Sequence, residues 1–175
     1  MEIKRTNRED IDTLMPIFEE ARKTIASLGI DQWQNGYPSR EVIEEDVKLM
    51  QSYFVTSDGE TVGTFALIED GEPTYDLIFG GAWLSGDKKD TYFAIHRVAI
   101  SVKCRGKGIS TQIIDYCADK AKKSGKISLR IDTHEGNLPM RRALEKAGFT
   151  FCGRITLIGG SEDGDPRLAF EKILE

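Results

Sequence analysis

The sequence is poor in cysteine and histidine and has no long apolar run. Its three cysteines, Cys104, Cys117 and Cys152, are an odd number at spacings that fit neither a disulfide framework nor a paired metal-ligand motif. We therefore expect three buried or incidental thiols, no bound metal and a reducing, cytoplasmic compartment. No apolar run approaches the roughly 20 residues of a membrane span, and residues 1–10 are polar. The sequence therefore predicts neither a membrane segment nor a secretion signal.

The composition is that of a folded, acidic protein. Hydrophobic residues make up 39% and charged residues 30%, and 24 Lys and Arg against 29 Asp and Glu give a net charge of −5. A chain of this size buries about 70% of its surface, which is enough for one core, so we expect residues 1–175 to form a single domain. The acidic balance disfavours a nucleic-acid partner and leaves a cationic small molecule or peptide as the expected one.

Hydrophobic periodicity predicts seven strands and four helices. The strands are expected at 2–6, 53–56, 61–68, 92–100, 127–133, 149–158 and 167–173, and the helices at 11–28, after Ser39, at 108–123 and at 138–147. We also expect part of a strand within 77–84, and a kink or a late helix start at Pro16. This order mixes hairpins with crossovers, so the predicted fold class is α/β (α+β) with a mixed sheet covered by helices.

The segment 103–110 combines cations with glycines between a strand and a helix. Lys103, Arg105 and Lys107 surround Gly106 and precede Gly108. Unpaired N–H groups at a helix start bind phosphate, although a tight turn with solvated basic residues is the alternative. The segment does not fit G-x-x-x-x-G-K-[ST], and it does not fit G-x-G-x-x-G.

The pattern Arg105-x-x-Gly108-x-Ser110 resembles the [QR]-x-x-G-x-[GA] motif of the GNAT superfamily of acyl-CoA-dependent N-acetyltransferases. The resemblance extends along the chain through the strand at 3–5, the helix start at 10–12, the strand at 98–100 and the segment 137–149. It implies a mostly antiparallel sheet of about seven strands flanked by about four helices. Two positions depart from the family pattern: Ser110 replaces Gly or Ala, and Leu144 replaces the tyrosine that often protonates the departing thiolate.

The resemblance implies that acetyl-CoA is the co-substrate and that its acetyl group passes to a primary amine of a small molecule or peptide by direct attack on the thioester. The residues that would hold acetyl-CoA are Val98, Ala99, Ile100, Arg105, Gly106, Lys107, Gly108, Ile109, Ser110 and Asn137, with Arg142 reaching the adenosine phosphates. A backbone N–H near Ala99 or Ile100 would stabilise the oxyanion. Asn137 could equally cap the helix that follows it. Arg142 could equally belong to a solvated basic face of that helix.

Two side chains are candidates for the proton chemistry. His96 titrates in the right range for a general base, and strict alternation would place it on the same face as Val98 and Ile100. Asp132, at the end of the neighbouring strand, could receive a cationic amine. A hydrogen-bonded core histidine and a capped turn are the structural alternatives.

Further candidates surround the acceptor. His134 and Glu135 follow Asp132, and Trp33 and Tyr37 lie in a polar loop where cation–π contact suits an amine. Trp83 and Tyr92 are expected to be core residues instead. Competing functions are a CoA-binding sensor or interaction module, because of Leu144, and a transferase that uses a longer acyl-CoA. An exposed terminal strand could support a homodimer.

Overall fold

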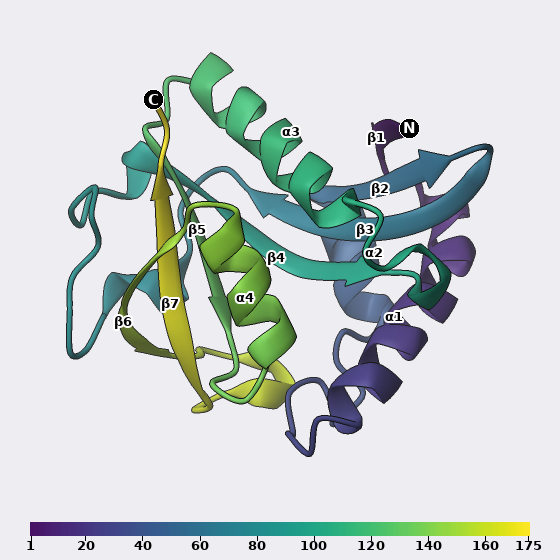
Figure 1. The fold of residues 1–175 in the computed structure, drawn as a ribbon, viewed down its shortest axis with the longest axis horizontal. Helices are drawn as coiled ribbons and strands as arrows, with labels where there is room; N and C mark the ends of the chain where they lie inside the picture. The colour runs from purple at the N-terminus through teal and green to yellow at the C-terminus, as the bar shows by residue number, and fades with distance from the viewer.

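The computed structural model describes all 175 residues, which form one seven-stranded sheet with four α-helices (Figure 1). The strands are β1 (Glu2–Arg5), β2 (Ser52–Ser57), β3 (Glu60–Ile68), β4 (Tyr92–Ile100), β5 (Ser128–Thr133), β6 (Thr150–Thr156) and β7 (Pro166–Ile173). The helices are α1 (Ile11–Ala26), α2 (Arg40–Lys48), α3 (Ile109–Lys123) and α4 (Leu138–Lys146). The predicted fold class is confirmed.

The sheet has the order β1-β2-β3-β4-β5-β7-β6, and only β4 and β5 are parallel. Their pairing covers Tyr92–Ala94 opposite Ser128–Arg130 and then stops. Beyond that point β4 stays paired with β3 as far as Ile100, and β5 stays paired with β7 as far as Thr133. The two halves of the sheet therefore separate in the middle, and one side of β4 is left without a strand partner.

A β-bulge interrupts β4 at Arg97. The register with β3 shifts between Thr64 and Ala66, and Arg97 has a φ of 54°, which is rare for a residue with a side chain. One extra residue reverses the alternation of side chains along the strand. Val98 consequently packs on the same core as Ile95, whereas His96 stacks on Tyr75 on the opposite face. The prediction that His96 shares a face with Val98 and Ile100 is wrong for this reason.

Helices cover both faces of the sheet. α3 and α4 pack on the largest core, and α3 buries a stripe at a spacing of four: Ile109, Ile113, Cys117 and Ala121. α1 and α2 cover the other face beside Ala99. A third cluster, formed with the connection between β3 and β4, contains Trp83 and Tyr92, as expected. No helix is both long and apolar enough to cross a membrane.

One local prediction was wrong, and one of the two alternatives at Pro16 was wrong as well. The segment 77–84 contributes one isolated bridge, Phe79 to Arg154, and no strand. At Pro16 the sequence predicted a kink or a late helix start; the helix begins at Ile11 and includes Pro16, so the late start is wrong and the kink stays a prediction. The strands at the two edges of the sheet are β1 and β6, while the oligomeric state stays a prediction.

Candidate active site

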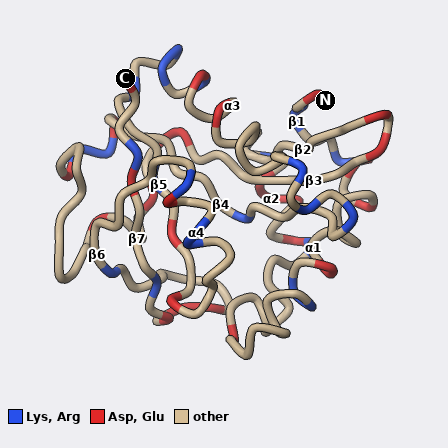
Figure 2. The backbone as a smooth tube through the Cα atoms, in the orientation of Figure 1, with Lys and Arg blue, Asp and Glu red and all other residues tan.

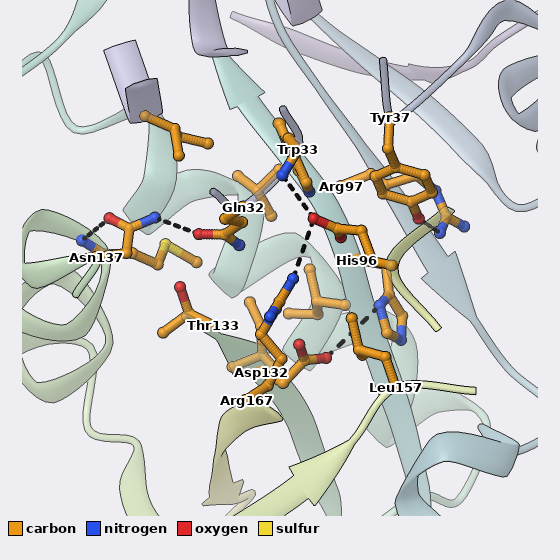
Figure 3. A pocket seen from close by; sticks show the side chains of 16 residues that line it. Gln32, Trp33, Tyr37, His96, Arg97, Asp132, Thr133, Asn137, Leu157 and Arg167 are labelled. Carbon is orange, nitrogen blue, oxygen red and sulfur yellow. Dashed lines mark hydrogen bonds and ion pairs between the residues drawn. The ribbon is translucent and has the colours of Figure 1, made fainter. Parts of the chain in front are cut away.

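A pocket opens where β4 and β5 separate (Figure 3). It encloses about 600 Å³, including the space that is open to solvent. β4, β5, the loop after α1, the start of α4 and the segment between β6 and β7 all contribute side chains to its wall. Of the predicted site residues, the structure brings Trp33, Tyr37, His96, Val98, Asp132 and Asn137 to this wall.

His96 lies between two carboxylates. Its Nε2 is 3.2 Å from Glu72 Oε2, and its Nδ1 is 3.9 Å from Asp132 Oδ1. Nε2 has no well-directed hydrogen bond, so the contact with Glu72 is an ion-pair contact of imperfect geometry. Tyr75 stacks on the imidazole, with ring centroids 5.7 Å apart, and donates a hydrogen bond of 2.7 Å to Asp132 Oδ1. The ring is thus fixed with one nitrogen toward Glu72 and the other toward Asp132.

The environment fixes the protonation of two neighbours of His96. Burial raises the pKa of Glu72, but the close contact with His96 and the positive charge of its protonated ring outweigh it, with help from the Thr74 N–H, and lower that pKa to about 2. Burial raises the pKa of Tyr75 well above its ordinary value, and the charge of Asp132 raises it further. At neutral pH Glu72 is therefore an anion and Tyr75 is a hydrogen-bond donor.

Arg97 is locked at the bulge by a buried ion pair. Its Nε and Nη2 each donate to Asp46 of α2 at 2.7 Å, and its Nη1 donates to Tyr37 Oη at 2.8 Å. Burial raises the pKa of Tyr37 although Arg97 opposes this, so the phenol stays protonated at neutral pH. A bidentate pair of this kind is rigid, and it ties the bulge of β4 to α2 and to the loop after α1.

A second buried pair closes the far wall of the pocket. Glu162 Oε1 lies 3.0 Å from Arg167 Nη2 and accepts the backbone N–H of Trp33 at 2.6 Å. Trp33 has a φ of 67°, so this bond holds the loop after α1 in an uncommon conformation. Asn137 caps α4 by accepting the Met140 N–H at 3.2 Å and also donates to Gln32 Oε1 at 3.0 Å (Figure 3).

The loop before α3 carries backbone N–H groups that have no acceptor in the protein. Gly106 and Gly108 have φ values of 74° and 78°, in the left-handed region that favours glycine. The N–H groups of Arg105 and Lys107 donate to carbonyls within the loop, whereas no acceptor is present for those of Gly106, Gly108, Ile109 and Ser110. The groups free to bind a phosphate are therefore fewer than the predicted span of 105–110.

This loop is anchored on α1 and surrounded by positive charge. Glu20 accepts the Val102 N–H at 3.0 Å, and Arg105 donates to Thr24 Oγ1 at 2.7 Å. Figure 2 shows basic residues at this end of α3. A Cβ placed on Gly106 or Gly108 would meet no atom within 4 Å, so the space above the loop is open. Open space, free N–H groups and a helix N-terminus together fit the pyrophosphate of CoA.

A sequence profile of the acetyltransferase (GNAT) family matches residues 18–149. The chain belongs to this family. A GNAT-family acetyltransferase from Streptococcus agalactiae 2603 is 35% identical, with a TM-score of 0.86 over 99% of this chain and 95% of that one. Membership of this family identifies the chain as an acetyltransferase, and GNAT enzymes use acetyl-CoA.

More distant structures share the fold alone. A GNAT-family acetyltransferase from Listeria monocytogenes 4b F2365 is 18% identical, with a TM-score of 0.70 over 99% of this chain and 94% of that one. An aminoglycoside 6'-N-acetyltransferase complexed with coenzyme A is 16% identical, with a TM-score of 0.64 over 100% and 98%. No curated protein sequence matches this chain.

Several positions predicted for this GNAT site lie outside the pocket. His134 accepts the Gly136 N–H and sits 3.4 Å from Asp31, and Glu135 pairs with Arg154 at the surface. Neither faces the pocket, because β5 ends at Thr133 and the chain turns away toward α4. Arg142 is exposed on α4. Leu144, at the position of the family tyrosine, is completely buried in the largest core.

Sequence reasoning missed the partners that arrange these side chains. Glu72 and Tyr75 come from an irregular connection that carries no motif, and nothing in its pattern could have identified them. Glu162 also comes from an irregular segment, between β6 and β7. Arg97 did give a signal, because a cation inside an apolar strand requires a buried partner.

Proposed function

We propose that this GNAT acetyltransferase transfers the acetyl group of acetyl-CoA to the primary amine of a small molecule or peptide by direct attack on the thioester. The observation that carries the proposal is the separation of β4 from β5. It leaves one side of β4 open between the glycine loop and the pocket that contains His96 and Asp132. A long, thin substrate bound along that side would reach from the loop to the pocket.

The loop and the open side of β4 would bind acetyl-CoA, which supplies the activated acetyl group. The free N–H groups of Gly106, Gly108 and Ile109 would hold the pyrophosphate, with Ser110 beside them. Because Ser101 donates its N–H to Val62 of β3, alternation along the strand directs the N–H of Ile100 to the open side. Of the two predicted oxyanion donors, Ile100 is therefore better placed than Ala99.

Asp132 and His96 would prepare the amine. A primary amine with a pKa near 10.4 costs about 4.6 kcal/mol to deprotonate at pH 7, so a base accelerates the reaction. Asp132 at the pocket wall would receive the ammonium group, and His96 would accept its proton. Glu72 would act as a positioning residue, because it orients the His96 ring.

The burial of Leu144 favours a second candidate function. With no tyrosine at that position, the domain could bind CoA without efficient turnover. A thiolate with a pKa near 8.5 leaves without assistance, however, so the missing acid does not prevent acetyl transfer. Release of the CoA thiol in the presence of an amine distinguishes acetyl transfer from CoA binding alone.

One screen tests both possibilities. Thiol release is measured with acetyl-CoA and with succinyl-CoA over a panel of diverse amines, and CoA binding is measured by calorimetry. The proposal expects CoA binding and amine-dependent thiol release that is faster with acetyl-CoA. CoA binding without thiol release for any amine would instead establish the sensor, and the absence of CoA binding would contradict both.

A further inference from the structure

The pocket beside His96 contains cations that are already neutralised. Arg97 uses three of its nitrogens on Asp46 and Tyr37. Arg167 lies 3.0 Å from Glu162 and 3.5 Å from a carboxylate oxygen of Asp165, and its Nη1 donates to a backbone carbonyl. Neither arginine offers an unneutralised charge to a substrate.

Two carboxylates in the same place share one histidine. No lysine or arginine nitrogen lies within 4 Å of Glu72 or Asp132, and His96 is the only basic partner of either. Whether the imidazole is protonated or neutral, this group of three side chains keeps a net negative charge. Asp132 lies on the pocket wall, whereas Glu72 is not part of the wall and contacts Nε2 of the imidazole.

The rest of the wall is suited to an apolar chain that ends in a cation. Its aliphatic members include Ile25, Ile131, Met140 and Leu157. Trp33 and Tyr37 meet edge to face on the same wall, with ring centroids 6.3 Å apart. Aromatic faces attract ammonium groups and offer nothing to a carboxylate.

We propose that the acceptor is an aliphatic amine without a carboxylate, and that the pocket discriminates against amino acids. This inference rests on the proposed function. The ammonium group would pair with Asp132. A carboxylate on the same substrate would lose its hydration beside Asp132, with the negative charge of Glu72 on the other nitrogen of His96 and no free cation to replace the water. The discrimination is therefore electrostatic and does not depend on size.

The Nη2 atom of Arg167 favours the opposite result, the binding of a substrate carboxylate, so the experiment must include amino acids. Its Nη2 is buried and has no well-directed hydrogen bond, which is the arrangement that a substrate carboxylate would use. Glu162 Oε1 already lies 3.0 Å from this nitrogen, however, and would repel a second carboxylate. If amino acids react faster than their decarboxylated counterparts, Arg167 binds the substrate carboxylate despite Glu162.

The experiment compares matched amines. The ratio kcat/KM is measured by thiol release for isoamylamine, leucinamide and leucine, and for cadaverine and lysine, with rates corrected for the unprotonated fraction of each amine. Isoamylamine and leucinamide should each exceed leucine by at least tenfold, and cadaverine should exceed lysine by a similar factor. Leucinamide keeps the bulk at Cα without the charge, so it separates charge from size.

Three outcomes would overturn the inference: leucine as good as isoamylamine, leucinamide as poor as leucine, or no turnover of any of the five amines. Each of these is distinguishable from failure of the proposed function. If another amine in the broad screen releases thiol, the acetyltransferase activity stands and only the substrate class is wrong.

Variants identify the source of the discrimination. In Asp132→Asn, and separately in Glu72→Gln, the preference for isoamylamine over leucine should fall at least threefold, whatever happens to the absolute rates. Glu135→Gln removes a carboxylate that lies outside the pocket, and it should leave the preference unchanged. An unchanged preference in both Asp132→Asn and Glu72→Gln would contradict the electrostatic explanation.

Discussion

The loop before α3 and the pocket beside His96 are built in opposite ways. The loop is one continuous segment whose function resides in backbone N–H groups, and a short motif with two glycines specifies it. The pocket takes its side chains from distant parts of the chain, and polar ones such as His96, Arg97 and Asp132 are held by partners from other elements. A site made of backbone groups can therefore be predicted from local sequence, whereas a site made of side chains depends on the completed fold.

The largest effect is expected at the ion pair that locks the bulge. Asp46→Ala leaves Arg97 buried without a counter-ion, which should cost about 3–5 kcal/mol of unfolding free energy in urea melts. The matched control is Asp12→Ala, which breaks an exposed pair with Arg40 and should cost no more than about 1 kcal/mol. Equal costs for the two variants would mean that the bulge does not depend on the lock.

The two histidines of the chain give the next comparison. His96→Ala should lower kcat/KM by about 10²–10³-fold with little change in CoA affinity, because a general base contributes on this scale. His134→Ala removes the same ring from a position outside the pocket and should leave kcat/KM within threefold. Similar losses in both variants would sink the assignment of His96 as the base.

Glu72 couples the pocket to pH. Its pKa of about 2 lies below the ordinary 4.5, so the stability it contributes is present above about pH 4.5 and is lost as the pH falls toward 2. Glu72→Gln should therefore lower the unfolding free energy by up to about 3 kcal/mol at neutral pH, and this difference should shrink across that acidic window. Chemical denaturation at a series of pH values measures it, and a difference that stays constant with pH would contradict the ion pair.

Two glycines at opposite ends of α3 separate the effect of backbone strain from the effect on CoA binding. Gly108 and Gly125 have φ values of 78° and 73°, and a Cβ on either would meet no neighbour. Substitution of either glycine by alanine should lower the unfolding free energy by a similar amount, about 1–2 kcal/mol, because alanine is strained in the left-handed conformation. Only Gly108→Ala should weaken CoA binding, by about tenfold in calorimetry, because only that Cβ enters the proposed phosphate site. Equal CoA affinity in the two variants would show that the pyrophosphate of CoA does not bind at this loop.

The smallest effect is expected at Arg142. It is exposed on α4, and a surface charge contributes about 1 kcal/mol or less, so Arg142→Ala should raise the Kd of CoA by about fivefold at most. The effect should disappear in high salt. A tenfold loss would show that Arg142 contacts the phosphates directly.

Much of the fold could be predicted from the sequence because its periodicity is regular. The seven strands and four helices follow from alternation and from stripes such as that of α3, and their ends lie near turn residues. The bulge at Arg97 could not be predicted from alternation, and it reversed the expected face of His96. The segment between β3 and β4 could not be predicted either, because its structure depends on the buried pair of Arg130 and Glu171 and on rings such as Trp83.

The candidate site was predicted unevenly for the same reason. Gly106 and Gly108 were predicted from their motif, His96 from its chemistry and its place within β4, and Asp132 from its place near the end of β5. His134 and Glu135 were placed beside Asp132 by sequence proximity, but β5 ends before them. Glu72 had no signal, because its role comes only from its distance to His96 in the folded chain.

We expect CoA to bind on the loop before α3 and along the open side of β4. The most direct measurement is a titration of ¹⁵N-labelled protein with CoA, followed by amide chemical shifts. The amide of Gly125, at the far end of α3, should not shift, and the largest shifts are expected at Gly106, Gly108, Ile109, Ser110 and Ile100. Saturable shifts centred elsewhere, with the amides of Gly106 and Gly108 unchanged, would contradict it.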